Sequence, residues 1–381
     1  MIKFKLNTLL NDNTIKGISK KREEYLNSGE DTLINTNSYV ERLRDKLYKE
    51  EIIVEIKNIE DYKTYKVITL SSLNEEELPI FKAGNKISLT IEVDNKYYSK
   101  AYTIVSSPNR CFNGIYKIVV RNSEDVIDKY LYSSVSIGER IIISSPFGEF
   151  YYNKLRDKNN VIAIVSGNGI LPIMSMIYSL IDNIDDYKLT VFYTEKYFED
   201  ILFYEELIKI NKMFKNININ IVLSSEDKDG CIKGFVTKKM IKDIIKNNNY
   251  SFFLSGTEGM LKYLNKELES LKLPKKLIRY EDYLPVCNIK KVNTYKLTLL
   301  INNEKYEVPC YNNKTIIQSI YESGIYIPSK CNVGSCGFCK SELLSGEVKI
   351  VNDKRDILDI KYNYIHPCST YPLSDIKIIV R

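Results

Sequence analysis

The spacing of four cysteines near the C-terminus constrains this chain more than any other feature. Cys331, Cys336 and Cys339 form a C-x4-C-x2-C pattern, and Cys368 follows after 28 intervening residues. Four thiolates with this spacing hold the two irons of a [2Fe–2S] cluster. Zinc sites, the alternative, usually place their cysteines as two C-x2-C pairs. The C-terminal segment is therefore expected to bring these four sulfurs together around a cluster.

Two glycines between the cysteines fit the same interpretation. Gly334 and Gly337 allow the backbone to curl around a cluster and to point N–H groups at its sulfurs. His366, the only histidine, lies two residues before a ligand, and we expect a structural role for it because the cysteines already complete the ligand set. The other cysteines have no ligand spacing and are expected to be ordinary thiols: Cys111, Cys231, Cys287 and Cys310.

Length and composition indicate a globular chain of two or three domains. The 381 residues exceed one ordinary domain, and 44% hydrophobic with 27% charged residues excludes disorder. The net charge of +6 is spread along the chain, which does not favour nucleic-acid binding. Without an apolar signal segment at the start, we expect a cytoplasmic protein. Residues 161–181 are uncharged, but Gly167, Gly169 and Pro172 interrupt them, so a strand, a turn and a helix are favoured over membrane insertion.

Hydrophobic patterning divides the chain into four parts. Residues 1–50 form a mostly helical extension with no interpretable motif, and short β-branched runs in residues 51–153 predict an antiparallel β-barrel. Residues 154–282 alternate strands with helices near 173–181, 202–210 and 237–245, which predicts a parallel α/β sheet with ligand at the carboxyl ends of its strands. After a linker, residues 293–381 are β-rich with one helix near 316–322.

The C-terminal part resembles a ferredoxin of the β-grasp fold. The resemblance rests on the cysteines together with Pro328-Ser329-Lys330, Leu343-Leu344-Ser345-Gly346 and Pro372-Leu373-Ser374-Asp375. The electron-transfer subunit of dihydroorotate dehydrogenase has a similar domain order, but its last cysteine lies much closer to the third. The chain is more similar to the reductase components of oxygenases and to hybrid-cluster-protein reductases.

Two segments of the predicted barrel resemble the ferredoxin–NADP reductase superfamily. Residues 100–108, KAYTIVSSP, resemble its R-x-Y-[ST] motif, and residues 146–150, PFGEF, resemble its P-x-G-x-F segment. The resemblance implies that Tyr102 packs against the flavin ring, that Thr103 hydrogen-bonds near its reactive edge and that Lys100 neutralises a flavin phosphate. The implied cofactor is FAD, with FMN as the alternative. The candidate flavin-site residues are Lys100, Tyr102, Thr103, Arg121, Pro146 and Gly148.

The chain departs from this family where the flavin phosphates would bind. Lys100 replaces an arginine, so a bidentate contact becomes a point charge. Asp125 and Asp128 stand where the family has G-x-x-S, and a carboxylate beside a phosphate repels it by roughly 1–4 kcal/mol. The departures predict weak flavin binding, FMN in place of FAD, or a shifted loop, with Arg121 supplying part of the missing charge.

The predicted α/β domain resembles the nucleotide domain of the same superfamily. Residues 166–175, SGNGILPIMS, follow a buried strand and resemble G-x-G-I-T-P, where glycines and a helix N-terminus favour anions. Leu171 replaces the threonine, and Ser255 replaces a cysteine that lies near the nicotinamide. Ser255 is therefore a candidate catalytic residue together with Tyr102 and Thr103. The candidate nucleotide-site residues are Gly167, Asn168, Gly169, Ile170, Lys196 and Gly256.

Taken together, these motifs predict an NAD(P)H-dependent oxidoreductase that passes electrons through a flavin and a [2Fe–2S] cluster to a partner redox protein. NADH is favoured over NADPH, although Lys196 alone does not decide between them. The departures leave two alternatives open: a relay subunit that a partner reduces, and a ferredoxin domain on a scaffold without flavin. An oxygenase, a hybrid-cluster protein and an anaerobic dehydrogenase all remain open as the acceptor.

Overall fold

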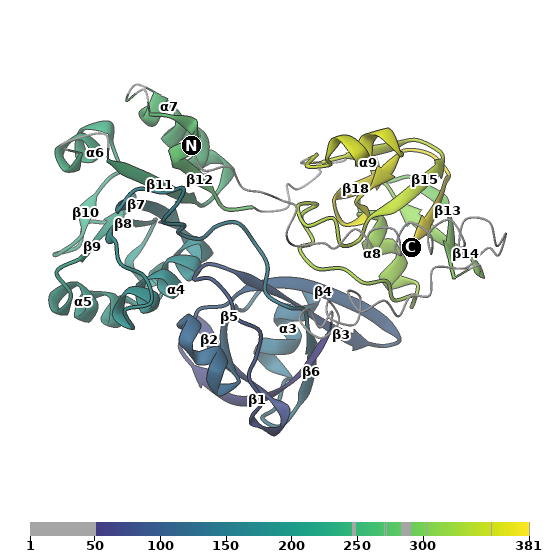
Figure 1. Ribbon diagram of the computed structural model, residues 1–381, viewed down its shortest axis with the longest axis horizontal. Coiled ribbons are helices and arrows are strands. Elements are labelled where there is room, and N and C mark those ends of the chain that lie inside the picture. Colours follow the sequence, from purple (N-terminus) through teal and green to yellow (C-terminus); the bar gives the residue numbers. More distant parts are fainter. Residues whose placement is uncertain are drawn as a thin grey trace, which may run out of the picture. The chain divides into compact units, whose positions relative to one another are not determined.

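The computed structural model describes residues 51–245, 249–269, 271, 273–282, 291–302, 304–351 and 353–380. The predicted helical extension over residues 1–50 and the thiol of Cys287 lie outside these residues. Three large sheets of distinct topology and one two-stranded sheet make up the described chain (Figure 1), and the predicted multidomain fold class is confirmed.

The first sheet is antiparallel and has the strand order β4-β3-β6-β1-β2-β5. Inward and outward residues alternate along its strands, as in β6, where Ile141 and Ile143 are buried and Ile142 is exposed. Helix α3 contacts both edge strands, β4 and β5, and so covers the open side of this half-barrel. The elements are β1 Ile52–Asp61, β2 Tyr65–Ser72, η2 Leu73–Glu75, β3 Lys86–Val93, β4 Lys96–Thr103, η3 Pro108–Asn113, β5 Ile115–Arg121, α3 Val126–Ser133 and β6 Arg140–Ile143.

The second sheet is parallel, with the order β10-β9-β8-β7-β11-β12. Its central strand β7 is buried on both faces: Ala163 and Val165 pack with the side that includes α4 and α5, and Ile162 and Ile164 with the side that includes α6 and α7. The elements are β7 Asn160–Ser166, η4 Gly167–Gly169, α4 Ile170–Ile181, β8 Lys188–Glu195, η5 Phe198–Asp200, α5 Tyr204–Met213, β9 Ile217–Leu223, β10 Ile232–Lys233, α6 Lys238–Ile244, β11 Tyr250–Ser255, α7 Glu258–Glu269, η6 Lys275–Leu277 and β12 Ile278–Tyr280.

The third sheet has the order β14-β13-β19-β15-β17, with β13 and β19 parallel, and a two-stranded sheet of β16 and β18 lies beside it. Thr315 begins α8 with a reciprocal capping box to Gln318. The elements are β13 Thr294–Ile301, β14 Glu304–Tyr311, α8 Ile316–Glu322, β15 Ser341–Ser345, β16 Val348–Ile350, α9 Ile357–Lys361, β17 Tyr364–Ile365, η7 Pro367–Ser369, β18 Thr370–Pro372 and β19 Ile376–Val380.

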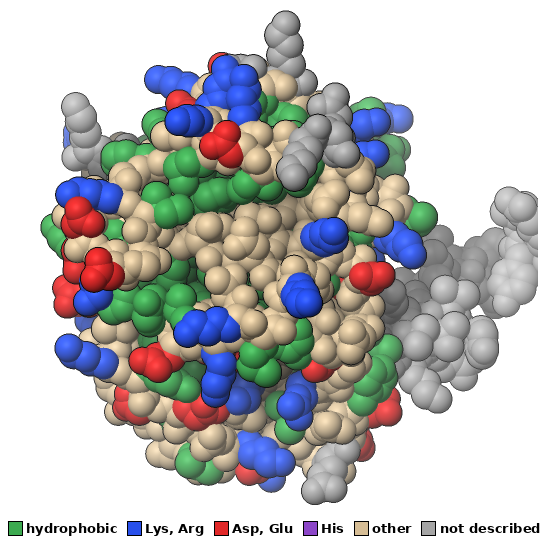
Figure 2. Space-filling model, turned by 90° about the vertical axis from the view of Figure 1, so that its left-hand side faces the viewer, with side chains coloured by type: hydrophobic (Ala, Val, Ile, Leu, Met, Phe, Trp, Pro, Cys, Tyr) green, Lys and Arg blue, Asp and Glu red, His purple; other side chains and the backbone are tan. Residues whose placement is uncertain are grey.

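The uncharged segment 161–181 divides into β7, the turn at Gly167–Gly169 and α4. In the described part of the chain, no helix has the length and apolar character that a membrane crossing requires. On the face that Figure 2 shows, basic and acidic side chains are interspersed, in keeping with a net charge that is spread along the sequence.

Candidate functional site

A cavity of about 610 Å³ lies where the strand order of the parallel sheet reverses. Strands β8 and β11 flank β7 on opposite sides, and ligands of doubly wound sheets bind outside the carboxyl ends of the strands at such a point. The turn after β7 and the end of β11 form one wall, and strands β3, β4 and β5 of the half-barrel form the other. The size is within the range of small-molecule and cofactor pockets.

The structure brings most of the predicted flavin and nucleotide residues together in this cavity. Pro146, Gly148 and Ile170 are not among the described residues that line it: the Gly148 carbonyl accepts a hydrogen bond from Asn85, and Ile170 is fully buried in the core. Lys196 lines a neighbouring pocket. The predicted residues that line the cavity are Lys100, Tyr102, Thr103, Arg121, Gly167, Asn168, Gly169, Ser255 and Gly256.

Tyr102 and Thr103 end strand β4 with only 6% and 7% of their surfaces exposed. The Tyr102 hydroxyl donates a 2.6 Å hydrogen bond to Asp128 Oδ1, and the Lys100 ammonium donates a 2.6 Å bond to Asp128 Oδ2. Burial, followed by the Asp128 charge, raises the pKa of Tyr102 far above its ordinary value. The phenol therefore stays protonated and fixed in place at neutral pH.

A second network begins at Ser255, the last residue of β11. Its buried hydroxyl donates to Glu281 Oε2, and the other oxygen of Glu281 pairs with Lys86 Nζ at 2.6 Å. Lys86 begins β3 and also donates to the Asp282 carbonyl at 3.2 Å. The sequence reasoning missed Lys86 and Glu281, since neither belongs to a local motif.

The turn after β7 requires its glycines for different reasons. Gly167 has φ +56°, a conformation that side chains with a Cβ rarely adopt, and a Cβ on Gly169 would lie 2.6 Å from Ser255 Oγ. Close packing of the turn against β11 therefore depends on Gly169. The turn leaves backbone N–H groups at the start of α4, an arrangement that binds anions.

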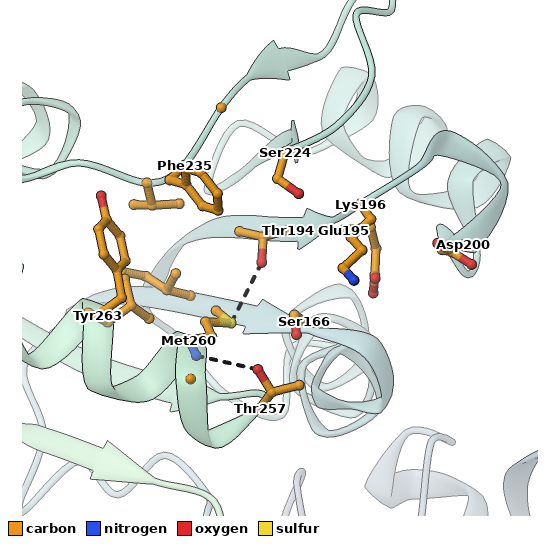
Figure 3. A pocket seen from close by; sticks show the side chains of 15 residues that line it. Ser166, Thr194, Glu195, Lys196, Asp200, Ser224, Phe235, Thr257, Met260 and Tyr263 are labelled. Carbon is orange, nitrogen blue, oxygen red and sulfur yellow. Dashed lines mark hydrogen bonds between the residues drawn. The ribbon is translucent and has the colours of Figure 1, made fainter.

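A second pocket, of about 440 Å³, adjoins the cavity through Ser166 and Thr257 (Figure 3). Glu195, the last residue of β8, accepts a 2.5 Å hydrogen bond from the Gly167 N–H. Burial raises the pKa of Glu195 to about 7, while this hydrogen bond lowers it and nearby Asp200 raises it further. The sequence reasoning missed Glu195, although an acidic residue ending the strand after a glycine turn is a known signal of nucleotide domains.

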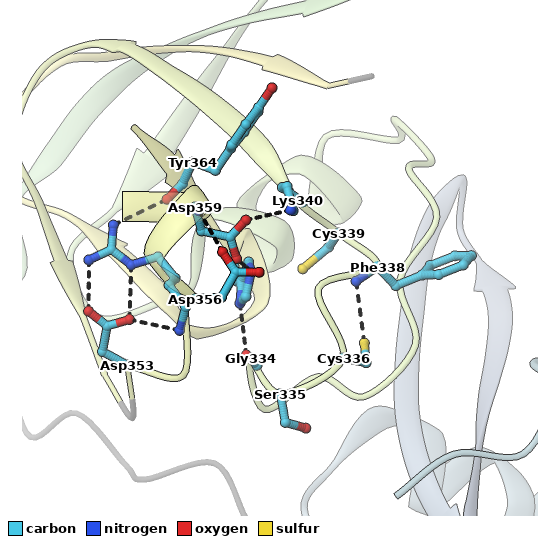
Figure 4. A network of polar contacts seen from close by, with 12 residues as sticks. Gly334, Ser335, Cys336, Phe338, Cys339, Lys340, Asp353, Asp356, Asp359 and Tyr364 are labelled. Carbon is cyan, nitrogen blue, oxygen red and sulfur yellow. Dashed lines mark hydrogen bonds and ion pairs between the residues drawn. The ribbon is translucent and has the colours of Figure 1, made fainter. Parts of the chain in front are cut away.

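The four predicted ligand cysteines converge in the third domain, and Figure 4 shows two of them, Cys336 and Cys339, on the loop that also carries Gly334. Cys339 Sγ lies 3.3 Å from Cys368 Sγ, and the Cys331 side chain forms hydrogen bonds with Cys336 and Cys368. The Val333 and Ser335 N–H groups point at Cys331 Sγ, at 3.4 and 3.3 Å. Backbone N–H donors stabilise cluster sulfurs, and four cysteine sulfurs gathered in one place are the ligand set of a [2Fe–2S] cluster, so the residues fit such a cluster.

His366 joins the cysteine loop to helix α9. Its Nδ1 lies 2.7 Å from the Gly334 carbonyl and its Nε2 lies 3.2 Å from Asp359 Oδ2, while Asp359 also pairs with Lys340. The ring is 3% exposed. These contacts hold the backbone of the loop in place, which supports the structural role proposed for His366.

Lys330, which precedes the first ligand, connects the cysteine loop with the half-barrel. Its carbonyl accepts a hydrogen bond from Ser88 Oγ, and its ammonium donates to Ser145 Oγ at 2.7 Å. Ser88 lies on β3, which pairs with the strand that carries Tyr102 and Thr103. The cluster loop therefore rests on the same strand pair that forms a wall of the cavity.

The cavity fits a flavin at one end better than at the other. Tyr102 and Thr103 offer a fixed aromatic ring and a hydroxyl for the isoalloxazine ring system. At the phosphate end, the candidate cation Lys100 already has Asp128 as its partner, and Asp125 lies 3.6 Å away. The ring end of the site fits the cofactor, whereas the phosphate end does not.

Three protein families match consecutive parts of the chain. Residues 54–152 match the oxidoreductase FAD-binding domain, residues 163–266 the oxidoreductase NAD-binding domain and residues 299–373 the 2Fe-2S iron–sulfur cluster binding domain. These matches confirm the predicted cofactor classes: a flavin, a nicotinamide nucleotide and a [2Fe–2S] cluster.

Several known proteins are similar over most of their length. The glycine betaine monooxygenase reductase subunit of Chromohalobacter salexigens is 23% identical over 78% of this chain and 87% of its own. The NADH oxidoreductase HCR of Escherichia coli is also 23% identical, over 83% and 94%. A solved structure of phthalate dioxygenase reductase is 19% identical, with a TM-score of 0.62 over 87% of this chain and 97% of that one.

Proposed function

This chain belongs to the ferredoxin–NADP reductase superfamily and carries a C-terminal [2Fe–2S] ferredoxin domain, and from that premise we propose that it oxidises NADH and passes electrons singly to an oxygenase-type partner. A flavin supplies the conversion between the two electrons of a hydride and the single electrons of the cluster. The observation that carries the proposal is that Tyr102, Thr103 and Ser255 line one cavity. The cysteine loop rests on β3, a strand of the half-barrel wall of this cavity.

Hydrogen bonds and an ion pair within the cavity fix the positions of its polar side chains. Tyr102 is fixed by Asp128, and Ser255 is fixed by Glu281 and through it by Lys86. These contacts keep the Tyr102 and Ser255 hydroxyls in one orientation, in which they would hold a flavin and a nicotinamide ring in place within the cavity. We propose that Ser255 contacts the nicotinamide and that Thr103 hydrogen-bonds the flavin.

The oxygenase-type partner is favoured by the relatives. Similar proteins include the reductase components of glycine betaine, carnitine and 3-ketosteroid monooxygenases. A hybrid-cluster protein, which the sequence left open as an acceptor, is the second candidate.

A relay subunit that a partner reduces is the alternative function, and two contacts favour it. The Asp128 carboxylate accepts a hydrogen bond from the Lys100 ammonium, and the Glu195 carboxylate accepts one from the Gly167 N–H. In both places a carboxylate of the chain stands where a cofactor phosphate would bind.

An anaerobic visible spectrum of the iron-reconstituted, flavin-loaded protein tests the proposal. Stoichiometric NADH should bleach both chromophores promptly. In Cys336→Ser, NADH should still bleach the flavin, but the cluster absorbance should be lost. A spectrum that NADH leaves unchanged and dithionite bleaches would reject the reductase in favour of the relay.

A further inference from the structure

The carboxylate of Asp128 accepts hydrogen bonds from three side chains at the phosphate end of the cavity. It accepts hydrogen bonds from Lys100 Nζ and the Tyr102 hydroxyl, each at 2.6 Å, and from Ser123 Oγ. The side chain of Asp128 is only 10% exposed. One cation and two hydroxyls on a single buried anion form the donor set that would otherwise hold a phosphate oxygen.

The first turn of α3 is occupied in the same way. Asp125 Oδ1 accepts hydrogen bonds from the Ile127 and Asp128 N–H groups at 3.0 and 3.2 Å. These are the backbone donors that make a helix N-terminus attractive to anions. Asp125 Oδ1 also lies 3.6 Å from Lys100 Nζ, so the cation and the helix turn both have carboxylate partners within the chain.

Most charged side chains of the cavity lining are paired with other residues of the chain. Its lining contains three basic side chains, Lys86, Lys100 and Arg121, and three acidic ones, Asp128, Glu281 and Asp282. Lys86 is paired with Glu281, Lys100 with Asp128, and Asp282 with Lys354, which is not among the lining residues. A phosphate group at Lys100 therefore meets a cation that Asp128 already neutralises, and Arg121 is the remaining basic side chain of the lining.

We propose that Asp128 is an internal substitute for the flavin phosphate, so that the chain holds its flavin by the ring system and gains little affinity from the phosphate. The proposal rests on the proposed function, because it concerns the flavin of that site. Binding an FMN or FAD phosphate at Lys100 requires Asp128 to give up its contacts, whereas the ring system meets Tyr102 and Thr103 without disturbing them. The flavin is accordingly an exchangeable cofactor.

The test compares riboflavin with FMN, which differ only in the phosphate. Full-length, cluster-loaded protein is stripped of flavin, and the dissociation constant of each flavin is measured by quenching of flavin fluorescence. In the wild type, FMN should bind less than about tenfold more tightly than riboflavin. Asp128→Asn keeps the shape and the acceptor oxygen but frees the Lys100 charge, and should increase the preference for FMN by more than about threefold.

Control variants separate this effect from folding and from overall charge. Asp227→Asn removes the same charge from a side chain that is 74% exposed and paired with Lys233, and should leave the preference unchanged. If Asp128→Asn does not fold, Asp125→Asn replaces it, because asparagine is an equally good N-cap; the preference for FMN should then rise by more than about twofold.

Two results overturn the proposal. One is a wild-type preference for FMN of more than about tenfold. The other is an increase in that preference of less than about threefold in Asp128→Asn, or of less than about twofold in Asp125→Asn where that variant replaces it. The reductase function is tested separately, by adding NADH to the flavin-loaded protein. Phosphate-dependent binding with normal reduction by NADH rejects the internal substitute alone. Flavin that binds as expected but is not reduced rejects the reductase alone.

Discussion

Replacing Glu195 by glutamine should remove a pH dependence from nucleotide binding. Glu195 Oε1 accepts the Gly167 N–H at 2.5 Å, and this N–H belongs to the glycine turn where a dinucleotide pyrophosphate is expected. Burial raises the pKa of Glu195 to about 7. Because the pKa of this acid is raised, its side chain is neutral below pH 7 and a carboxylate above it, and only the carboxylate repels the pyrophosphate.

The size of the effect follows from the fraction of neutral Glu195. The apparent dissociation constant equals the intrinsic one divided by the binding-competent fraction. For a pKa of about 7, that fraction is about 0.9 at pH 6 and about 0.1 at pH 8. The apparent dissociation constant of the wild type should therefore rise about tenfold between pH 6 and pH 8.

Calorimetric titration with NAD⁺ at constant ionic strength measures this dependence, since the pyrophosphate of NAD⁺ stays ionised throughout. Glu195→Gln should bind NAD⁺ with nearly the same constant at both pH values, close to the wild-type value at pH 6. Asp200→Asn should move the transition to lower pH, because Asp200 contributes to the raised pKa of Glu195. A wild-type constant that changes less than about twofold, or a glutamine variant with the wild-type slope, would refute the reasoning.

Three further outcomes follow from the structure. Cys336→Ser should abolish the EPR signal of the reduced cluster, whereas Cys310→Ser, a buried thiol without ligand spacing, should retain it. Thr315→Ala removes the capping box of α8 and should lower the free energy of unfolding by about 1 kcal/mol, as measured by urea denaturation with Thr→Ser as the control. Arg279→Met removes one of the partners of the fully buried Asp157 side chain and should destabilise the protein by about 3 kcal/mol in the same assay; a loss below about 1 kcal/mol, typical of exposed pairs, would contradict this.

The sequence predicted those features whose signal is local. The cluster ligands follow from spacing, three of them within nine residues, and the two larger sheets follow from runs of β-branched residues and from alternation with helices. Helix α7, Glu258–Glu269, was missed, although Leu261, Leu264 and Leu268 recur on its buried face. The signal was available, but a polar helix with few apolar positions is less evident than the nearly continuous apolar run of α4.

Contacts between distant segments could not be predicted. The ion pair of Lys86 with Glu281 joins the first strand of the cavity wall to the end of the parallel sheet, and neither residue stands in a recognisable motif. The repulsion expected from Asp125 and Asp128 was predictable from their positions. That Asp128 would also bind Lys100 and the Tyr102 hydroxyl depends on how α3 packs against β4, which only the fold determines.

The three cofactor sites differ in how their donors are satisfied before any cofactor binds. In the cysteine loop, the Val333 and Ser335 N–H groups point at Cys331 Sγ, so the contacts that hold the protein sulfurs are the ones that a cluster retains. At the flavin and nucleotide ends, Asp128 and Glu195 take donors that a phosphate needs. Binding there exchanges one anion for another, and the net gain is small because the desolvated donors were never unpaired. The chain is therefore built to keep its cluster and to exchange its flavin and nucleotide.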